Sequence, residues 1–225
     1  LESGKRVGGF VPQNKEEIKD LLNLGMNFIT FNVEGNDIEN SPYFSREFHV
    51  PSASSGLTIG RGYDMAHRSP DEIQKDLVDA SVDADKADII SDAAGLTGPQ
   101  AEAFIADKDL EDFTITWAEQ LKLFEVVYEE IERDTRRLAT KDDVQRKYGV
   151  TNWENLNETI QEILVDLRYR GDYTPSCRRF LQHHVARNDL ARFTEETDNR
   201  DRWLNVPSDR FMQRAAFCRN AVDST

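Results

Sequence analysis

The chain has 225 residues, of which 38% are hydrophobic and 31% charged, and it carries a formal net charge of −14 at pH 7. This balance predicts a soluble globular protein, and the negative charge argues against sequence-independent binding to nucleic acid, which requires a basic surface. No apolar run approaches the roughly 20 residues that span a bilayer, so we expect no membrane insertion.

Cysteine usage and the N-terminal residues bear on where the chain works. Its only cysteines, Cys177 and Cys218, lie in no CxxC motif and no Cys/His cluster, so we expect no metal site. The sequence leaves open whether the two form a disulfide. Residues 1–10 lack the apolar stretch of a secretory signal, so we expect a mature form, an excised domain or a protein that other machinery delivers.

The N-terminal segment has a helical pattern. Asn14 predicts the N-cap of a helix whose apolar spacing, interrupted at Gly25, continues to Val33. Gly35-Asn36 is expected to end this helix, because both residues accept the backbone conformation of a helix C-terminus.

The segment from about residue 36 to 68 is predicted to be a small β lobe. Here Ser, Gly, Pro and aromatic residues replace the helical period. Short strands are expected at Glu47–Val50 and Leu57–Ile59, joined by the turn-rich stretch Pro51–Gly56.

Helical signals dominate the remainder, about residues 69–225. Ser69-Pro70-Asp71-Glu72 is a capping box with proline at the first helical position, and it opens a helix that Gly95 should close. The same capping pattern occurs at Thr97–Gln100 and Thr116–Glu119. Three further helices are expected, one ending at Gly171 and two beginning at Thr174-Pro175 and after Pro207. We therefore expect an α+β fold, mainly α, in a single domain of residues 1–225.

Two motifs between Gly25 and Asp64 resemble those of a known enzyme family. Residues 25–29, Gly-Met-Asn-Phe-Ile, followed by Glu34-Gly35, resemble the first helix of phage-type lysozymes, which ends on an acidic Glu before Gly. Residues 55–62, Ser-Gly-Leu-Thr-Ile-Gly-Arg-Gly, resemble the hairpin strand of the same family. The resemblance implies a lysozyme-like fold, in which a small β-hairpin lobe and a helical bundle enclose a saccharide cleft.

Glu34 is the catalytic acid that this resemblance implies. Cleavage of a glycosidic bond requires a carboxylic acid that stays protonated near neutral pH. The apolar neighbours Phe31 and Val33 and the C-terminal end of a helix dipole should both raise the pKa of a carboxyl group at this position.

The second catalytic group is expected on the hairpin. Phage lysozymes carry a second carboxylate where this chain has Tyr43, whereas pesticin-like muramidases place an Asp just after the Thr-Ile strand. The latter arrangement implies Thr58 and Asp64 on the side of the attacking water. A fully extended strand would hold these two residues roughly 20 Å apart. Gly60 and Gly62 must therefore bend the chain. The alternative second carboxylates are Asp37, Glu39 and Glu47.

The resemblance implies hydrolysis, without a cofactor, of the β-1,4 bond between N-acetylmuramic acid and N-acetylglucosamine in peptidoglycan glycan strands. It leaves open whether the anomeric configuration is retained or inverted. By analogy with the pesticin-like group, we expect the toxic domain of an antibacterial effector or bacteriocin, secreted or delivered to the periplasm or cell wall of a target bacterium. A producing cell would then need an immunity protein, and the charge of −14 predicts a basic one.

Two alternatives to a muramidase remain open. A chitosanase-type glycosidase on the same fold would act on a cationic polymer, which suits an acidic protein. A non-catalytic cell-wall-binding module would bind sacculi without releasing reducing sugar, and fold alone does not distinguish these functions.

Overall fold

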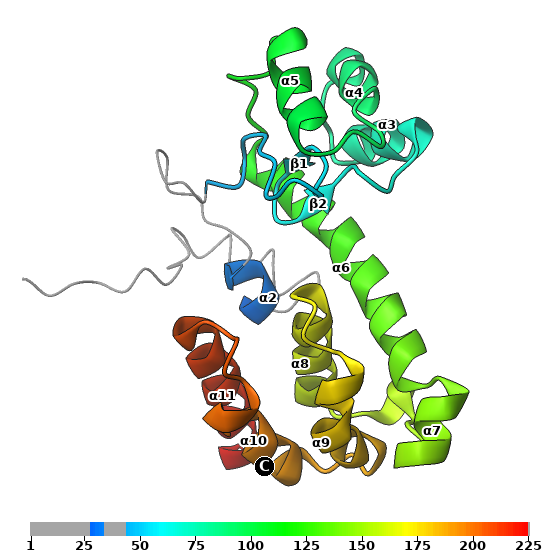
Figure 1. Cartoon of the computed structure of the whole chain (residues 1–225), viewed down its shortest axis with the longest axis vertical. Coiled ribbons are helices and arrows are strands. Elements are labelled where there is room, and N and C mark those ends of the chain that lie inside the picture. Colours follow the sequence, from blue (N-terminus) through cyan, green and yellow to red (C-terminus); the bar gives the residue numbers. More distant parts are fainter. Residues whose placement is uncertain (1–27, 34–43, 225) are drawn as a thin grey trace, which may run out of the picture. The chain divides into compact units, whose positions relative to one another are not determined.

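The computed structural model describes residues 28–33 and 44–224 of the chain. Helices make up most of this part, and β1 and β2 form a two-stranded antiparallel sheet (Figure 1). The expected α+β class, mainly α, is confirmed. No helix in this part of the chain combines the length and apolarity that crossing a bilayer requires.

In chain order the elements are α2 (Phe28–Val33), β1 (Thr58–Ile59), β2 (Tyr63–Asp64), α3 (Pro70–Asp79), α4 (Ala84–Ser91), α5 (Pro99–Asp107), α6 (Trp117–Ala139), α7 (Asp142–Tyr148), the 3-10 turn η1 (Trp153–Asn155), α8 (Glu158–Tyr169), α9 (Pro175–Ala186), α10 (Leu190–Thr197), the 3-10 turn η2 (Arg200–Arg202) and α11 (Ser208–Asp223).

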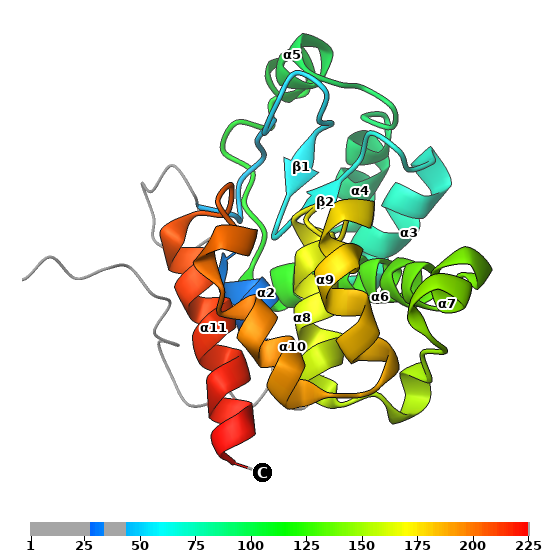
Figure 2. The ribbon, with the colours of Figure 1, turned by 60° about the horizontal axis from the view of Figure 1, so that its bottom comes forward.

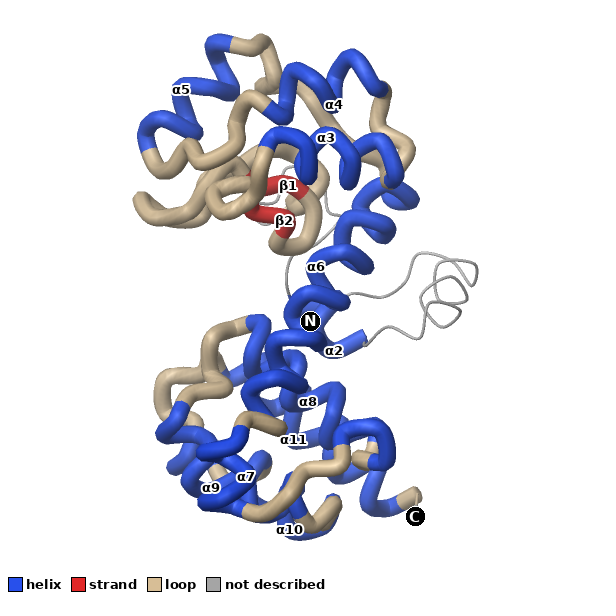
Figure 3. Tube along the Cα trace, turned by 90° about the vertical axis from the view of Figure 1, so that its right-hand side faces the viewer, coloured by secondary structure: helices blue, strands red, loops and turns tan. Residues whose placement is uncertain are grey.

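The chain divides into two compact units, residues 1–127 and 128–225, and the boundary falls inside α6. In the first unit, α3, α4 and α5 lie around the β1–β2 hairpin (Figure 3). Backbone hydrogen bonds hold this arrangement: the Gly95 N–H donates to the Met65 carbonyl at 3.3 Å and the Gly98 N–H to the Ser55 carbonyl at 3.0 Å. Helices α3 to α5 therefore belong with the small sheet, and the single domain of residues 1–225 stays a prediction.

Two of the expected helix starts form reciprocal capping boxes. The Ser69 hydroxyl accepts the Glu72 N–H, and the Glu72 carboxylate accepts the Ser69 N–H, so the capping box of α3 is confirmed. A second reciprocal pair at the start of α6 joins Thr116 and Glu119. At α5 the expected Thr97 cap is wrong, because Gly98 occupies the N-cap position without a side-chain hydrogen bond.

The single helix expected from Ser69 to Gly95 is wrong, since the chain forms two helices there. Helix α3 ends in a Schellman motif: Ser81 has a φ of +79°, and the Val82 N–H donates to the Leu77 carbonyl at 2.9 Å. Asp83 then caps α4 by accepting the backbone N–H groups of the first turn. The apolar spacing continues across this break, which concealed it in the sequence. Helices α7 and α10 were likewise not expected.

In the second unit, α8, α9, α10 and α11 pack side by side (Figure 2). A buried ion cluster joins α8 to α11. Asp166 has no exposed surface and accepts hydrogen bonds from Arg210, at 2.6 Å, and from Arg214. Arg214 is also paired with Asp172 at 2.9 Å. The buried Asp166 carboxylate thus offsets part of the free-energy cost of removing two guanidinium charges from water.

We expect Asp166→Ala to lower the free energy of unfolding by about 3–5 kcal/mol, because it leaves two buried guanidinium groups without their shared carboxylate. Urea denaturation followed by circular dichroism measures the change. Asp79→Ala is the matched control: it removes an exposed carboxylate paired with Lys75 and should cost less than about 1 kcal/mol. Equal losses in the two variants would contradict a stabilising role of the buried cluster.

Candidate active site

The expected bend of the hairpin is confirmed. Strands β1 and β2 are antiparallel, with Thr58 opposite Asp64 and Ile59 opposite Tyr63. Gly60 and Gly62 have φ angles of +62° and +89°, a conformation that L side chains rarely adopt. The turn therefore returns the chain on itself and makes the two expected site residues direct cross-strand neighbours.

The strand expected at Glu47–Val50 forms as two isolated bridges rather than a regular strand. His49 pairs with Thr58 through two backbone hydrogen bonds of 3.0 and 2.9 Å. Glu47 pairs instead with Thr114, from the segment before α6. Thr58 consequently has a backbone partner on each side, which fixes its position in the centre of the lobe.

The side chains of Thr58 and Asp64 both contact Gly56. The Thr58 hydroxyl is buried and donates to the Gly56 carbonyl at 3.1 Å. The Asp64 carboxylate accepts the Gly56 N–H at 3.1 and 3.2 Å and the Ala66 N–H at 2.7 Å. Asp64 therefore clamps the two ends of the hairpin, which is a structural role. The water-side role implied for it stays a prediction.

Arg61, at the tip of the hairpin, attaches the hairpin to α2. Its guanidinium group is fully buried, donates to the Phe31 carbonyl and lies 3.8 Å from the centre of the Phe31 ring. Phe31 in turn meets the rings of Trp117 and Phe124 edge-on, at 5.3 and 5.0 Å between centroids. The last turn of α2 is thus held between the hairpin and the first half of α6.

Glu34 directly follows α2 in the chain but lies outside the described residues, as do Asp37, Glu39 and Tyr43. Of the alternative second carboxylates, Glu47 is described, and it is exposed. The structure therefore brings together the hairpin residues Thr58 and Asp64 and the helix that precedes the expected acid.

The second strand of the hairpin is tied to α3. The Tyr63 hydroxyl donates to Asp76 at 2.8 Å, and the Arg68 guanidinium lies 4.3 Å from the centre of the Tyr63 ring. Arg68 also pairs with Asp76 at 3.6 Å. The hairpin is thus attached to α2 through Arg61 and to α3 through Tyr63.

Glu162 on α8 is a perturbed carboxyl group that the sequence interpretation missed. Burial raises its pKa to about 7, and the nearby Glu158 carboxylate adds to the effect. A pKa in this range is typical of groups that transfer protons near neutral pH. The pair Glu158 and Glu162, one helical turn apart on α8 beside the apolar face formed by Ile160, Ile163 and Leu164, is the signal that could have indicated it.

The two cysteines do not supply a nucleophile. Cys177 and Cys218 are free and buried, and burial raises the pKa of each thiol to about 12. Both therefore stay protonated at neutral pH, and a thiol is a poor nucleophile. Within residues 28–33 and 44–224, no group of three or more His, Cys, Asp or Glu side chains could hold a metal ion.

Comparison with known proteins assigns the chain to a family. Residues 27–215 match the family described as Domain of unknown function (DUF8812), and the chain therefore belongs to this family. The match spans Glu34, Thr58 and Asp64 as well as both compact units. No curated protein matches the chain.

Gly56→Ala should destabilise the hairpin, although it replaces none of the candidate catalytic residues. An added Cβ would lie 2.5 Å from the Ala66 nitrogen and 2.6 Å from an Asp64 carboxylate oxygen, closer than atoms tolerate. We expect a loss of about 1–3 kcal/mol in the free energy of unfolding, measured by urea denaturation. Ser54→Ala, an exposed change in the same turn, should stay within about 0.5 kcal/mol. A Gly56→Ala protein as stable as the Ser54→Ala protein would contradict the clamp.

Glu162→Gln should stabilise the protein at alkaline pH and leave it unchanged at acid pH. The ordinary pKa of 4.5 applies to the unfolded chain, and the pKa in the folded protein is about 7. Between these values the folded state binds the extra proton, so the free energy of unfolding falls as pH rises through this window. Removal of the Glu162 charge should raise the free energy of unfolding by about 1–2 kcal/mol at pH 8, a value that allows for the partial exposure of this side chain.

Urea denaturation of wild type and Glu162→Gln at pH 4 and pH 8 tests this pH dependence. Glu102→Gln, which changes an exposed carboxylate on α5, should leave the difference between the two pH values unaltered. A Glu162→Gln effect of equal size at both pH values would show that ionisation of Glu162 is not its cause.

Proposed function

We propose that this member of the DUF8812 family is a muramidase, which hydrolyses the β-1,4 bond between N-acetylmuramic acid and N-acetylglucosamine in peptidoglycan. The observation that carries the proposal is the buried contact between Arg61 and Phe31. Through it, the hairpin motif and the helix motif, separated in the sequence, meet in space. The motifs of a shared active site must lie close together in the folded protein. Two motifs that resembled the lysozyme family only by chance would have no reason to be neighbours.

In this proposal Glu34 is the general acid that protonates the leaving oxygen. It follows a helix whose last turn is packed among the aromatic rings of Phe31, Trp117 and Phe124. Apolar surroundings and the C-terminal end of a helix both disfavour a carboxylate, and hence favour the protonated acid that glycoside hydrolysis needs.

Thr58 and Asp64 act on the other side of the bond, where water attacks. Two backbone amides hold the Asp64 carboxylate in one orientation, and the Thr58 hydroxyl lies across from it on β1. An oriented carboxylate can hold a water molecule or stabilise developing positive charge on the sugar. Delivery as an antibacterial effector or bacteriocin, with a basic immunity partner, completes the proposal.

One observation favours a second candidate, a chitosanase-type glycosidase. Residues 1–127, which contain the candidate site, carry 24 Asp and Glu against 11 Lys and Arg. A surplus of 13 negative charges would attract a cationic chitosan chain more strongly than an anionic cell wall.

The test is release of soluble muropeptides from purified sacculi, identified by mass spectrometry, by wild type and Glu34→Gln. We expect products with reducing muramic acid ends from wild type and a loss of at least about a thousandfold in the variant, because glutamine keeps the shape but supplies no acid proton. The melting temperature of Glu34→Gln should remain close to that of wild type.

Glu162→Gln is the matched control, since it replaces the other candidate acid by the same isostere and should retain activity. Activity lost in Glu162→Gln and kept in Glu34→Gln would assign the acid to α8 and overturn the proposed site. Asp64→Asn keeps an acceptor for the backbone clamp, so a loss of activity without a loss of stability would support a water-side role. Products from chitosan but not from sacculi would select the second candidate.

A further inference from the structure

A basic surface in the second unit contrasts with the acidic composition of the chain. Residues 128–225 contain 17 Lys and Arg against 18 Asp and Glu, a net charge of −1, whereas residues 1–127 have a net charge of −13. The overall −14 therefore lies almost entirely in the first unit. Within the second unit, cations gather on α7 and at the neighbouring ends of α6 and α9.

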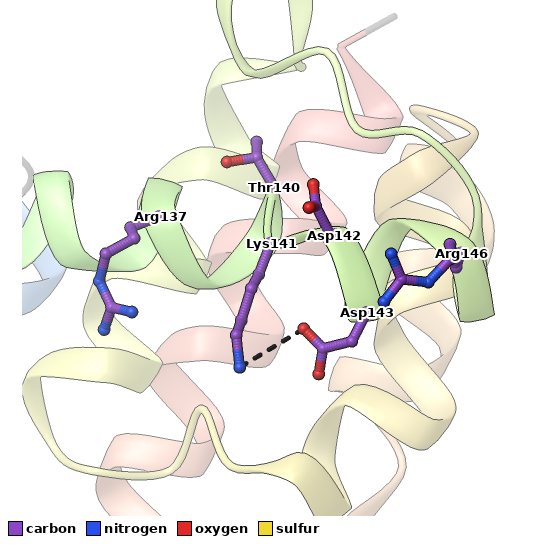
Figure 4. Close-up of a pocket in the computed structure, with 6 residues that line it drawn as sticks. All are labelled: Arg137, Thr140, Lys141, Asp142, Asp143 and Arg146. Atoms are coloured by element: carbon purple, nitrogen blue, oxygen red, sulfur yellow. Dashed lines mark ion pairs between the residues drawn. The ribbon is translucent and has the colours of Figure 1, made fainter.

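These cations line two hollows that share one residue. The first, of about 560 Å³, lies where α6 meets α7 and is lined by Arg137, Thr140, Lys141, Asp142, Asp143 and Arg146 (Figure 4). The second, of about 150 Å³, lies between α7 and α9, where Asp143 again contributes together with Lys147, Arg178 and Arg179. Six cations and two carboxylates therefore surround the pair of hollows, here named the basic face.

Most of the charge of the basic face is not neutralised by neighbouring carboxylates. Lys141 pairs with Asp143 at 3.4 Å, and Arg137 pairs with Asp134 at 2.5 Å. By contrast, Arg146, Lys147 and Arg179 are exposed and form no ion pair with any residue that the structure describes. In Figure 4 the Lys141 ammonium group reaches the Asp143 carboxylate from one side, and the Arg146 side chain is drawn on the other side of this carboxylate.

We propose that the basic face binds a phosphodiester polymer of the bacterial wall, a chain of the poly(glycerol phosphate) type. Guanidinium groups match phosphate oxygens in a bidentate geometry, so the arginines favour phosphate over other anions. Two adjacent hollows suit a repeating anion better than a single ion, and exposed lining residues suit a polymer that stays partly hydrated. Duplex DNA is disfavoured, because its dense charge calls for a more extended basic surface than these six cations provide.

This inference rests on the proposed function for its location at the wall but not for its chemistry. The residues of the basic face belong to the second unit, and the hairpin residues Thr58 and Asp64 belong to the first. Binding and hydrolysis can therefore be removed separately.

The experiment measures binding of poly(glycerol phosphate) to the full chain carrying Glu34→Gln, by isothermal titration calorimetry at low and moderate salt. We expect binding that weakens as salt rises, and a loss of affinity of roughly tenfold or more when Arg146→Glu and Arg179→Glu are added. The matched control adds Lys86→Glu and Arg187→Glu, which change the net charge equally at exposed sites outside the basic face, and should stay within roughly twofold. Far-UV circular dichroism checks that both proteins fold.

Three outcomes would overturn the inference: no binding at low salt, equal losses in the two double variants, or tighter binding of duplex DNA with the same number of phosphates. Muropeptide release by wild type from sacculi stripped of phosphodiester polymer tests the proposed function alone. Hydrolysis of stripped sacculi without polymer binding would leave the muramidase in place and remove the polymer site. Polymer binding by a wild-type protein that releases no muropeptides would leave the polymer site in place and remove the muramidase proposal.

Discussion

A guanidinium group taken out of water needs partners for its charge and for its N–H donors. Arg61 is fully buried, and α2 supplies two of its contacts: its guanidinium group donates to the Phe31 carbonyl and lies over the Phe31 ring. The contact joins a residue of the hairpin turn to the backbone and the ring of a residue of α2. The position of the hairpin relative to α2, and with it the candidate site, depends on this contact.

Polar side chains with several hydrogen-bond partners also join other segments that are distant in the sequence. Asp64 holds the Gly56 and Ala66 amides and so closes the hairpin, while Asp166 joins α8 to two arginines of α11. Each carboxylate accepts several hydrogen bonds, so moving it would leave several buried donors unsatisfied at once. Apolar packing drives each unit to collapse, and these polar contacts define which arrangement results.

Features governed by neighbouring residues could be predicted from the sequence. The caps at Ser69 and Thr116 and the bend at Gly60 and Gly62 follow from local backbone chemistry, and all three are confirmed. The break at Ser81 was missed because the apolar pattern runs through it. The burial of Arg61 and the pKa of Glu162 depend on side chains brought together only by folding. The gathering of Arg146 with Arg179 likewise needs the packing of α7 against α9.

The uneven charge offers a resolution of the conflict between an acidic protein and an anionic wall. Repulsion acts over about 8 Å at physiological salt, so the charges nearest the wall decide whether the chain stays there. If the chain acts at the wall as proposed, a first unit of net charge −13 would be repelled there, and tight binding by this unit would also slow release of the cleaved glycan. The proposed polymer binding by the basic face would supply attraction from the second unit without adding cations to the candidate active site. Since α6 continues without interruption across the boundary, the two units are covalently joined by this helix, and attachment of one would keep the other near the wall. The acidic composition then need not indicate a cationic substrate, and under this arrangement the choice between peptidoglycan and chitosan is made by the chemistry at the hairpin.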